Sequence, residues 1–110
     1  AAIENVIRNA LRHAPPGSSV DVTLQQGPGV GQACMVVRDR GPGVQADQLG
    51  RIFEPFYRVA EARERSSGGA GLGLAIAARV IRAHGGSIAA TLAEPGLAVT
   101  MTVPVGPQVR

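Results

Sequence analysis

The sequence predicts a single α+β domain, because helix-like and strand-like hydrophobic patterns alternate along its 110 residues. Two segments, residues 3–14 and about 71–84, have the apolar spacing of amphipathic helices. Four shorter segments read as strands, in two pairs separated by turns that contain glycine and proline. Hydrophobic residues make up 45% of the chain and aromatic residues 3%, so aliphatic side chains must fill the core.

The first predicted helix precedes the first pair of strands. Its apolar face consists of Ile3, Val6, Ile7, Ala10, Leu11 and Ala14. The run Pro15-Pro16-Gly17 should end this helix. Val20, Val22 and Leu24 alternate with polar residues, which predicts a half-buried strand. Ala33 to Val37 is an unbroken apolar run, which predicts a strand buried on both faces, with Cys34 buried in it.

The second half of the chain has a loop-rich middle and a regular end. Residues 46–53 could form a short helix, and residues 58–69 are charged and poor in apolar residues, which predicts a mobile loop. The second helix should run from about Gly71 to His84. Its inward side chains should be Leu72, Ile76, Val80 and Ile81, and Gly85-Gly86 should end it. The segments 87–93 and 97–103 should then form a closing hairpin around Glu94-Pro95-Gly96.

The composition excludes several classes of function. All 11 basic residues are arginine, so the chain lacks the lysine on which a P-loop NTPase depends. The net charge of +3 is dispersed and no basic stripe carries aromatic residues, so we expect no nucleic-acid partner. A single cysteine fits a reducing compartment. No apolar stretch approaches the ~20 residues that span a bilayer, so we expect no direct membrane contact from this segment.

The first helix also has an unusual polar face. Six residues project along one side of it: Glu4, Asn5, Arg8, Asn9, Arg12 and His13. Asparagine is a poor helix former, and its neutral amide oxygen suits a hard cation, so the stripe is a candidate cation site. The alternative is an ordinary solvated helix face.

The segment Asp39-Arg40-Gly41-Pro42-Gly43 directly follows the predicted buried strand. A carboxylate in that position is costly unless it is paired, and it could accept a hydrogen bond from an exocyclic amine such as that of adenine. Gly41 and Gly43 would allow a flat base to approach the backbone. The alternative is a plain type I or type II turn.

Three glycines, Gly69, Gly71 and Gly73, open the second predicted helix. Glycines there expose backbone N–H groups at the positive end of the helix dipole, which suits phosphates. The Rossmann pattern is excluded, because it requires glycine at the position of Leu74 or Ile76 and a strand in place of the charged loop.

The order and spacing of these segments resemble the catalytic domain of sensor histidine kinases, within the GHKL ATPase superfamily. Residues 4–13 look like the N box, 39–43 like the first glycine box, Phe53 to Arg58 like the F box and 69–74 like the second glycine box. Together the boxes extend over nearly the whole chain. The stretch from Phe56 to Arg63 most resembles the envelope-stress sensor kinases of the Cpx type.

The resemblance implies a role for each matching residue. Asn9 would bind Mg²⁺ with Asn5 beside it, Arg12 would contact phosphate and His13 would flank the nucleotide. Asp39 would bind the adenine amine of ATP, with Gly41 and Gly43 shaping the pocket. Gly69, Gly71, Leu72 and Gly73 would receive the phosphates, and Arg58 would reach the terminal phosphate. Phe53 and Phe56 would hold a lid that extends from residue 58 to 69. Glu4 would handle a proton, or would contribute only local charge.

The resemblance also implies a fold and partners. Residues 1–110 would form part of a two-layer α/β sandwich of the Bergerat type, with helices on one face of a mixed sheet and with strands and dimerisation helices preceding Ala1. The partners would be the phosphoacceptor domain of the same homodimeric kinase and a response regulator. The segment would lie in the cytoplasm, and the parent protein would be anchored in the bacterial inner membrane.

Two other functions remain open on the sequence. One is an ATP-hydrolysing clamp of the gyrase or mismatch-repair type, which the F box argues against. The other is an inactive nucleotide-binding or protein-interaction module. Neither His13 nor His84 lies in the His-Glu-x-x-x-Pro pattern of a phosphoacceptor histidine.

Overall fold

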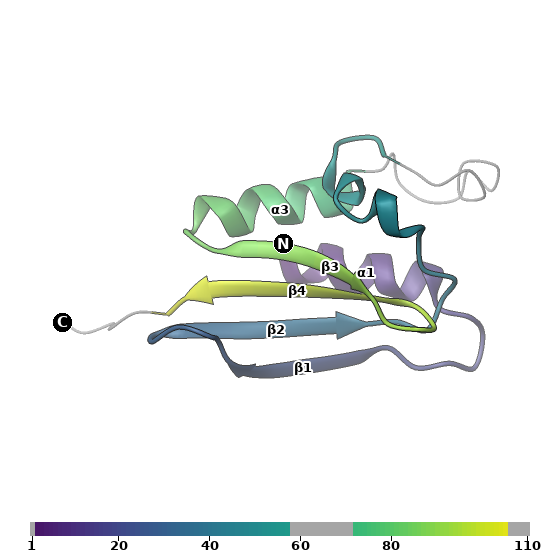
Figure 1. The fold of residues 1–110 in the computed structure, drawn as a ribbon, viewed down its shortest axis with the longest axis horizontal. Coiled ribbons are helices and arrows are strands. Elements are labelled where there is room, and N and C mark those ends of the chain that lie inside the picture. Colours follow the sequence, from purple (N-terminus) through teal and green to yellow (C-terminus); the bar gives the residue numbers. More distant parts are fainter. Residues whose placement is uncertain (1, 58–71, 106–110) are drawn as a thin grey trace.

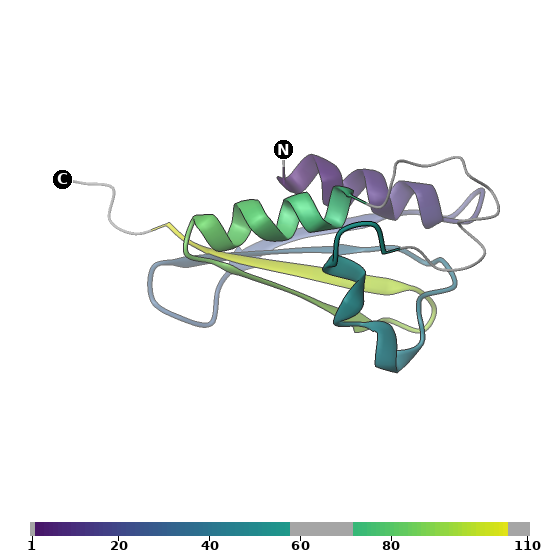
Figure 2. The ribbon, with the colours of Figure 1, turned by 90° about the horizontal axis from the view of Figure 1, so that it is seen from above.

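The computed structural model describes residues 2–57 and 72–105, which form a sheet covered on one face by helices (Figures 1 and 2). The helices are α1 (Ala2–His13) and α3 (Gly73–Ala83). The strands are β1 (Asp21–Gln26), β2 (Gln32–Arg38), β3 (Ser87–Leu92) and β4 (Leu97–Pro104), in the spatial order β1-β2-β4-β3. The predicted two-layer α+β arrangement is confirmed. Among these strands every pairing is antiparallel, where a mixed sheet was predicted.

The core lies between the helices and the two central strands. Val37 of β2 pairs with Val99 of β4, and Met35 pairs with Met101, so aliphatic side chains form neighbouring rows on the sheet. Val37, Val99 and Met101 are almost completely buried. The prediction that β2 is buried on both faces is confirmed only in part. Cys34 and Val37, which lie on opposite faces because side chains alternate along a strand, are buried, and the other residues of β2 are half-buried.

The buried face of α1 differs from the predicted one. Ala2, Val6 and Ala10 are buried, whereas Ile3 and Leu11 are 45% and 60% exposed. The buried residues are four apart and mostly small, which allows α1 to approach both α3 and the sheet closely. Hydrophobic periodicity identified the helix correctly, but size complementarity decided which side of it faces the core.

The same selection for small side chains occurs in α3. Ala77, Ala78 and Ile81 are buried, whereas Leu72 and Ile76 are 37% and 43% exposed, so the predicted inward positions of these two residues are wrong. The glycine stop is confirmed at the helix end, where the Gly86 N–H donates to the Ile81 carbonyl over 2.9 Å and Gly85 has φ +81°.

The first strand, β1, is exposed along its whole length, so the prediction that it is half-buried is wrong. It lies at the edge of the sheet, and pairs only with β2 among the described strands. Its register places Val22 opposite Val37 and Leu24 opposite Met35, yet within the described residues nothing covers these two side chains enough to bury them.

Two further segments complete the described fold. The predicted short helix over 46–53 is instead two 3₁₀ turns, Ala46–Gln48 and Arg51–Phe53. The predicted closing hairpin is confirmed, and its turn from Ala93 to Gly96 lies at the same end of the molecule as the end of β2 (Figure 1). Within residues 2–57 and 72–105 no helix is long and apolar enough to cross a membrane.

Candidate functional site

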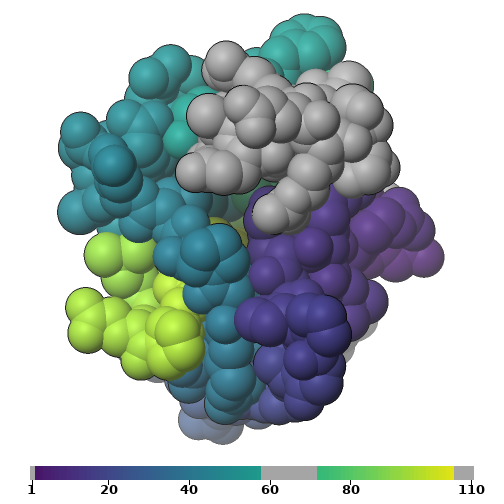
Figure 3. Space-filling view, turned by 90° about the vertical axis from the view of Figure 1, so that its right-hand side faces the viewer, coloured from purple at the N-terminus to yellow at the C-terminus, as the bar shows by residue number. Residues whose placement is uncertain are grey.

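Three of the predicted motifs meet at one end of the molecule. The end of α1, the loop that follows β2 and the start of α3 all lie on the right-hand side of Figure 1, and Figure 3 views that side face on. The β3–β4 turn lies there too. Segments up to about 80 residues apart in the sequence therefore surround a common site.

Asp39 directly follows the central strand β2. It is 4% exposed and is the one buried charged or polar residue among those the structure describes. Its Oδ1 accepts a hydrogen bond from the Gly41 N–H over 2.8 Å, and its own N–H donates to the Leu97 carbonyl over 3.0 Å. The first bond is a local turn of the kind considered as the alternative reading. It uses only part of the acceptor capacity of the carboxylate, which leaves sites for a ligand amine.

Gly41 brings the loop after β2 against the end of α1. A Cβ at this position would lie 2.4 Å from the carbonyl oxygen of His13, which no real side chain tolerates. Gly41 is buried. This glycine is therefore required for close packing between the two motifs, a reason that differs from the predicted approach of a flat base.

Gly43 and Gly96 form a second close contact of the same loop. Gly43 has φ +71° and a Cβ there would lie 3.1 Å from the Gly96 carbonyl oxygen. Gly96 has φ +106°, and a Cβ there would lie 1.9 Å from the carbonyl oxygen of Asp39. Sequence reasoning assigned Gly96 only to a hairpin turn and missed this contact.

The polar face of α1 is graded in exposure. Asn5, Asn9 and His13 are half-buried, whereas Glu4, Arg8 and Arg12 are exposed. His13 Nδ1 lies 2.9 Å from the Asn9 carbonyl oxygen, and a carbonyl can only accept, so Nδ1 carries the proton of that bond. Nε2 then remains the ring atom that could face a ligand.

The start of α3 lies beside the polar face of α1. A Cβ on Gly73 would lie 3.9 Å from both the Cβ and the Oδ1 of Asn5. Leu72 occupies the N-cap position and provides no side-chain hydrogen bond. The first N–H groups of α3 are thus not capped by that residue, and such groups are a suitable site for an anion.

The residues do not form a protein-only metal cage. Among the described residues no three His, Cys, Asp or Glu side chains cluster. Mg²⁺ bound to a nucleotide requires few protein ligands, because phosphates and water complete its shell. The paired amide side chains of Asn5 and Asn9 fit that requirement.

Part of the predicted site lies outside the described residues. Arg58, Gly69 and Gly71 belong to this part, as does the predicted lid. In the preceding F box, Phe53 packs against the core, whereas Phe56 is 68% exposed with φ 65°. Tyr57 also packs against the core, and its hydroxyl donates to Gln48 Oε1 over 2.9 Å.

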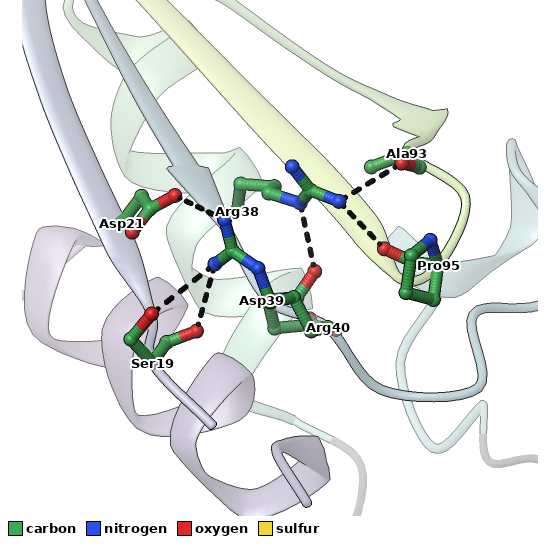
Figure 4. Close-up of polar contacts among 7 residues, drawn as sticks. All are labelled: Ser19, Asp21, Arg38, Asp39, Arg40, Ala93 and Pro95. Carbon is green, nitrogen blue, oxygen red and sulfur yellow. Dashed lines mark hydrogen bonds and ion pairs between the residues drawn. The ribbon is translucent and has the colours of Figure 1, made fainter. Parts of the chain in front are cut away.

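Two arginines on either side of Asp39 were not singled out from the sequence (Figure 4). Arg38 reaches the β3–β4 turn, and Arg40 pairs with Asp21 at 2.8 Å and with the Ser19 carbonyl. The hydrogen bond from Arg40, together with the charges of both arginines, holds the pKa of Asp21 below its ordinary value. The sequence does place an arginine on each side of Asp39, but only the structure shows which segments the two side chains contact.

Comparisons with known proteins agree with this arrangement. Residues 1–107 match the family model described as histidine kinase-, DNA gyrase B-, and HSP90-like ATPase. The sensor histidine kinase WalK of Bacillus subtilis is 39% identical over 93% of this chain and 17% of its own length. The solved mycobacterial sensor histidine kinase MprB superposes with a TM-score of 0.80 at 37% identity, over 94% of this chain and 67% of that one.

A third comparison concerns a nucleotide complex. The structure of full-length ShkA in complex with AMPPNP superposes with a TM-score of 0.78 at 32% identity, over 94% of this chain and 20% of ShkA. This chain spans between 17% and 26% of the curated relatives WalK of B. subtilis, IrlS and SenX3. The chain therefore belongs to the family of histidine kinase-, DNA gyrase B- and HSP90-like ATPases, and is a homologue of the sensor histidine kinases.

Proposed function

We propose that this chain binds ATP with Mg²⁺ at the end of the sheet where β2 ends, and donates the γ-phosphoryl group to a histidine of a dimerisation domain. The phosphoryl group would pass from that histidine to an aspartate of a response regulator. The relatives named as sensor histidine kinases support this proposal.

The observation that carries the proposal is that three kinds of potential ligand-binding group lie at one end of the molecule. A buried carboxylate, Asp39, lies at one side of it, and the start of α3 lies beside Asn5 of α1. In a nucleotide bound with Mg²⁺, Asp39 suits the base, the start of α3 suits the phosphates and Asn5 suits the metal ion. The contact of Gly41 with the end of α1 holds the base-binding and metal-binding motifs together.

We assign a role to each candidate site residue that the structure describes. Asp39 accepts a hydrogen bond from the adenine amine, with Gly41 and Gly43 shaping the loop around it. Asn9 binds Mg²⁺ with Asn5 beside it, and Mg²⁺, when bound, neutralises charge on the phosphates. The remaining proposed contacts to phosphate come from Arg12, Leu72 and Gly73, and His13 flanks the nucleotide. Most of the catalytic effect in such a reaction is positioning and charge neutralisation.

Other proposed roles rest on the family motifs. Arg58 would contact the terminal phosphate, and Gly69 and Gly71 would extend the phosphate site. Glu4 either handles a proton or contributes local charge. The parent protein would be a homodimer anchored in the inner membrane, with this domain in the cytoplasm.

A transfer assay distinguishes this function from its two alternatives. The chain would be incubated with γ-labelled ATP and Mg²⁺, with and without a separate dimerisation domain from a sensor kinase of this family. Acid-labile label on that domain is the expected result. Release of inorganic phosphate without an acceptor would instead indicate a hydrolase of the gyrase type. Nucleotide binding with neither reaction would indicate an inactive module.

A further inference from the structure

We propose that Arg38 is a positioning residue for adenine recognition: it holds the β3–β4 turn against the backbone of Asp39, so that the carboxylate keeps its direction. This inference rests on the proposed role of Asp39 in the previous section. It adds to the site a residue and a turn that none of the recognised boxes contains.

The guanidinium group of Arg38 donates three hydrogen bonds within the described residues, and all three go to backbone carbonyl oxygens. Its Nη2 donates to Ala93 and to Pro95, each over 3.0 Å, and its Nε donates to Asp39 over 3.3 Å (Figure 4). The guanidinium therefore fixes the path of two chain segments more than 50 residues apart, and does not pair with the Asp39 carboxylate. A planar fork of donors suits this task better than a single ammonium group.

The turn that Arg38 holds presses directly on the site loop. The Gly96 backbone approaches Asp39 so closely that a Cβ would lie 1.9 Å from its carbonyl oxygen and 2.9 Å from the Cα of Arg40. The Gly96 carbonyl closes the turn by accepting from the Ala93 N–H over 3.0 Å, and it also faces Gly43. Displacement of the turn would thus release the Asp39 backbone and the loop that carries Gly43.

Arg40 provides a matched comparison, because it is the arginine on the other side of Asp39. Its hydrogen bonds go to Ser19 and Asp21, away from the β3–β4 turn (Figure 4). Loss of Arg40 removes a charge of the same sign at the same distance from Asp39 in the sequence, but should leave the β3–β4 turn in place.

The test measures base selectivity, which a general loss of stability would not change. Dissociation constants of the 110-residue chain for ATP, GTP and inorganic tripolyphosphate, each with Mg²⁺, would be measured by calorimetry for wild type, Arg38→Met, Arg38→Lys and Arg40→Met. We expect Arg38→Met to weaken ATP binding about three- to tenfold, with GTP and tripolyphosphate unchanged. Arg38→Lys should lose part of the ATP preference, and Arg40→Met should keep it.

Several results would overturn the inference. An unchanged ratio of ATP to GTP affinity in folded Arg38→Met is one, and an equal loss for ATP and tripolyphosphate is another. If thermal melting shows that Arg38→Met is unfolded, Arg38→Lys decides, and an unchanged ratio there rejects the positioning role. Absence of any ATP preference in the wild type would reject the proposed adenine recognition itself, which distinguishes that failure from a failure of Arg38 alone.

Discussion

At the scale of single residues, the site combines one buried charge with glycines that have no room for a side chain. Asp39 is 4% exposed, and its carboxylate accepts a hydrogen bond from the Gly41 N–H. Burial of a carboxylate is unfavourable unless hydrogen bonds compensate it. Gly41 allows that compensation and at the same time allows contact with the end of α1. The turn formed by residues 39–41 therefore serves both the fold and the candidate site.

Asp39→Ala should lower ATP affinity by about ten- to a hundredfold, because a hydrogen bond to a charged group contributes roughly 1.5–3 kcal/mol. Guanine presents a carbonyl where adenine has its amine, so GTP binding should change little. Calorimetry with both nucleotides measures the two effects. Equal affinity of the wild-type protein for ATP and GTP would contradict the role of Asp39.

Gly41→Ala should destabilise the domain, because the new methyl group would lie 2.4 Å from the His13 carbonyl oxygen. Overpacking of this kind costs about 1–3 kcal/mol. Urea denaturation provides the measurement. Gly50→Ala is the matched control, since a Cβ there meets nothing within 4 Å and φ is −77°. The control should be neutral or slightly stabilising, and equal losses in both variants would refute the packing argument.

At the scale of elements, α1 has two separate tasks on two faces. Ala2, Val6 and Ala10 pack against the rest of the core, while Asn5 and Asn9 lie half-buried towards the site. Gly73 lies beside Asn5, since a Cβ on Gly73 would be 3.9 Å from the Asn5 side chain, so the start of α3 adjoins this polar face.

Asn9→Ala tests the metal role of this helix. Alanine is the better helix former, so circular dichroism should be unchanged. The dependence of ATP binding on Mg²⁺ should fall, because one amide oxygen is removed from the proposed ligand set. Titration of Mg²⁺ at fixed ATP measures this. Arg8→Ala, an exposed neighbour on the same helix, should retain the wild-type dependence. If Asn9→Ala retains it too, Asn9 is not a ligand.

At the scale of the whole molecule, the candidate site lies at one end, and the two described histidines differ in their distance from it. His13 is hydrogen-bonded to the carbonyl of Asn9 within α1. His84 follows the far end of α3, an 11-residue helix whose first residue faces the site. At about 1.5 Å per residue, that places it roughly 16 Å from the start of the helix.

The 110-residue chain should therefore not phosphorylate itself. Phosphoryl transfer requires an acceptor atom in line with the bond that breaks. In the proposed binding mode, His13 flanks the nucleotide and His84 lies far from the phosphates, so we expect neither histidine to occupy that position. Incubation with γ-labelled ATP followed by an acid-lability test is the measurement. Acid-labile label on this chain in the absence of a dimerisation domain would contradict the proposal that the acceptor histidine belongs to that domain.

Some features followed from the sequence alone, since they depend on local spacing and chemistry. The two helices, the closing hairpin and the buried Cys34 were predicted by hydrophobic period and by turn residues. The same holds for the place of Asp39 at the end of a central strand. Its motif could be recognised because carboxylate and glycines are adjacent in the chain.

Other features depended on contacts between distant segments, which no local pattern encodes. The rotation of α1 and α3 that exposes Ile3 and Ile76 follows from the close packing of their alanines. The exposure of β1 follows from its place at the edge of the described sheet. The role of Gly96 arises only when the last hairpin folds back onto Asp39, more than 50 residues earlier in the chain. The sequence alone thus identified the candidate groups for nucleotide binding, because their motifs are local, whereas tertiary packing decided which distant backbone segments hold those groups in place.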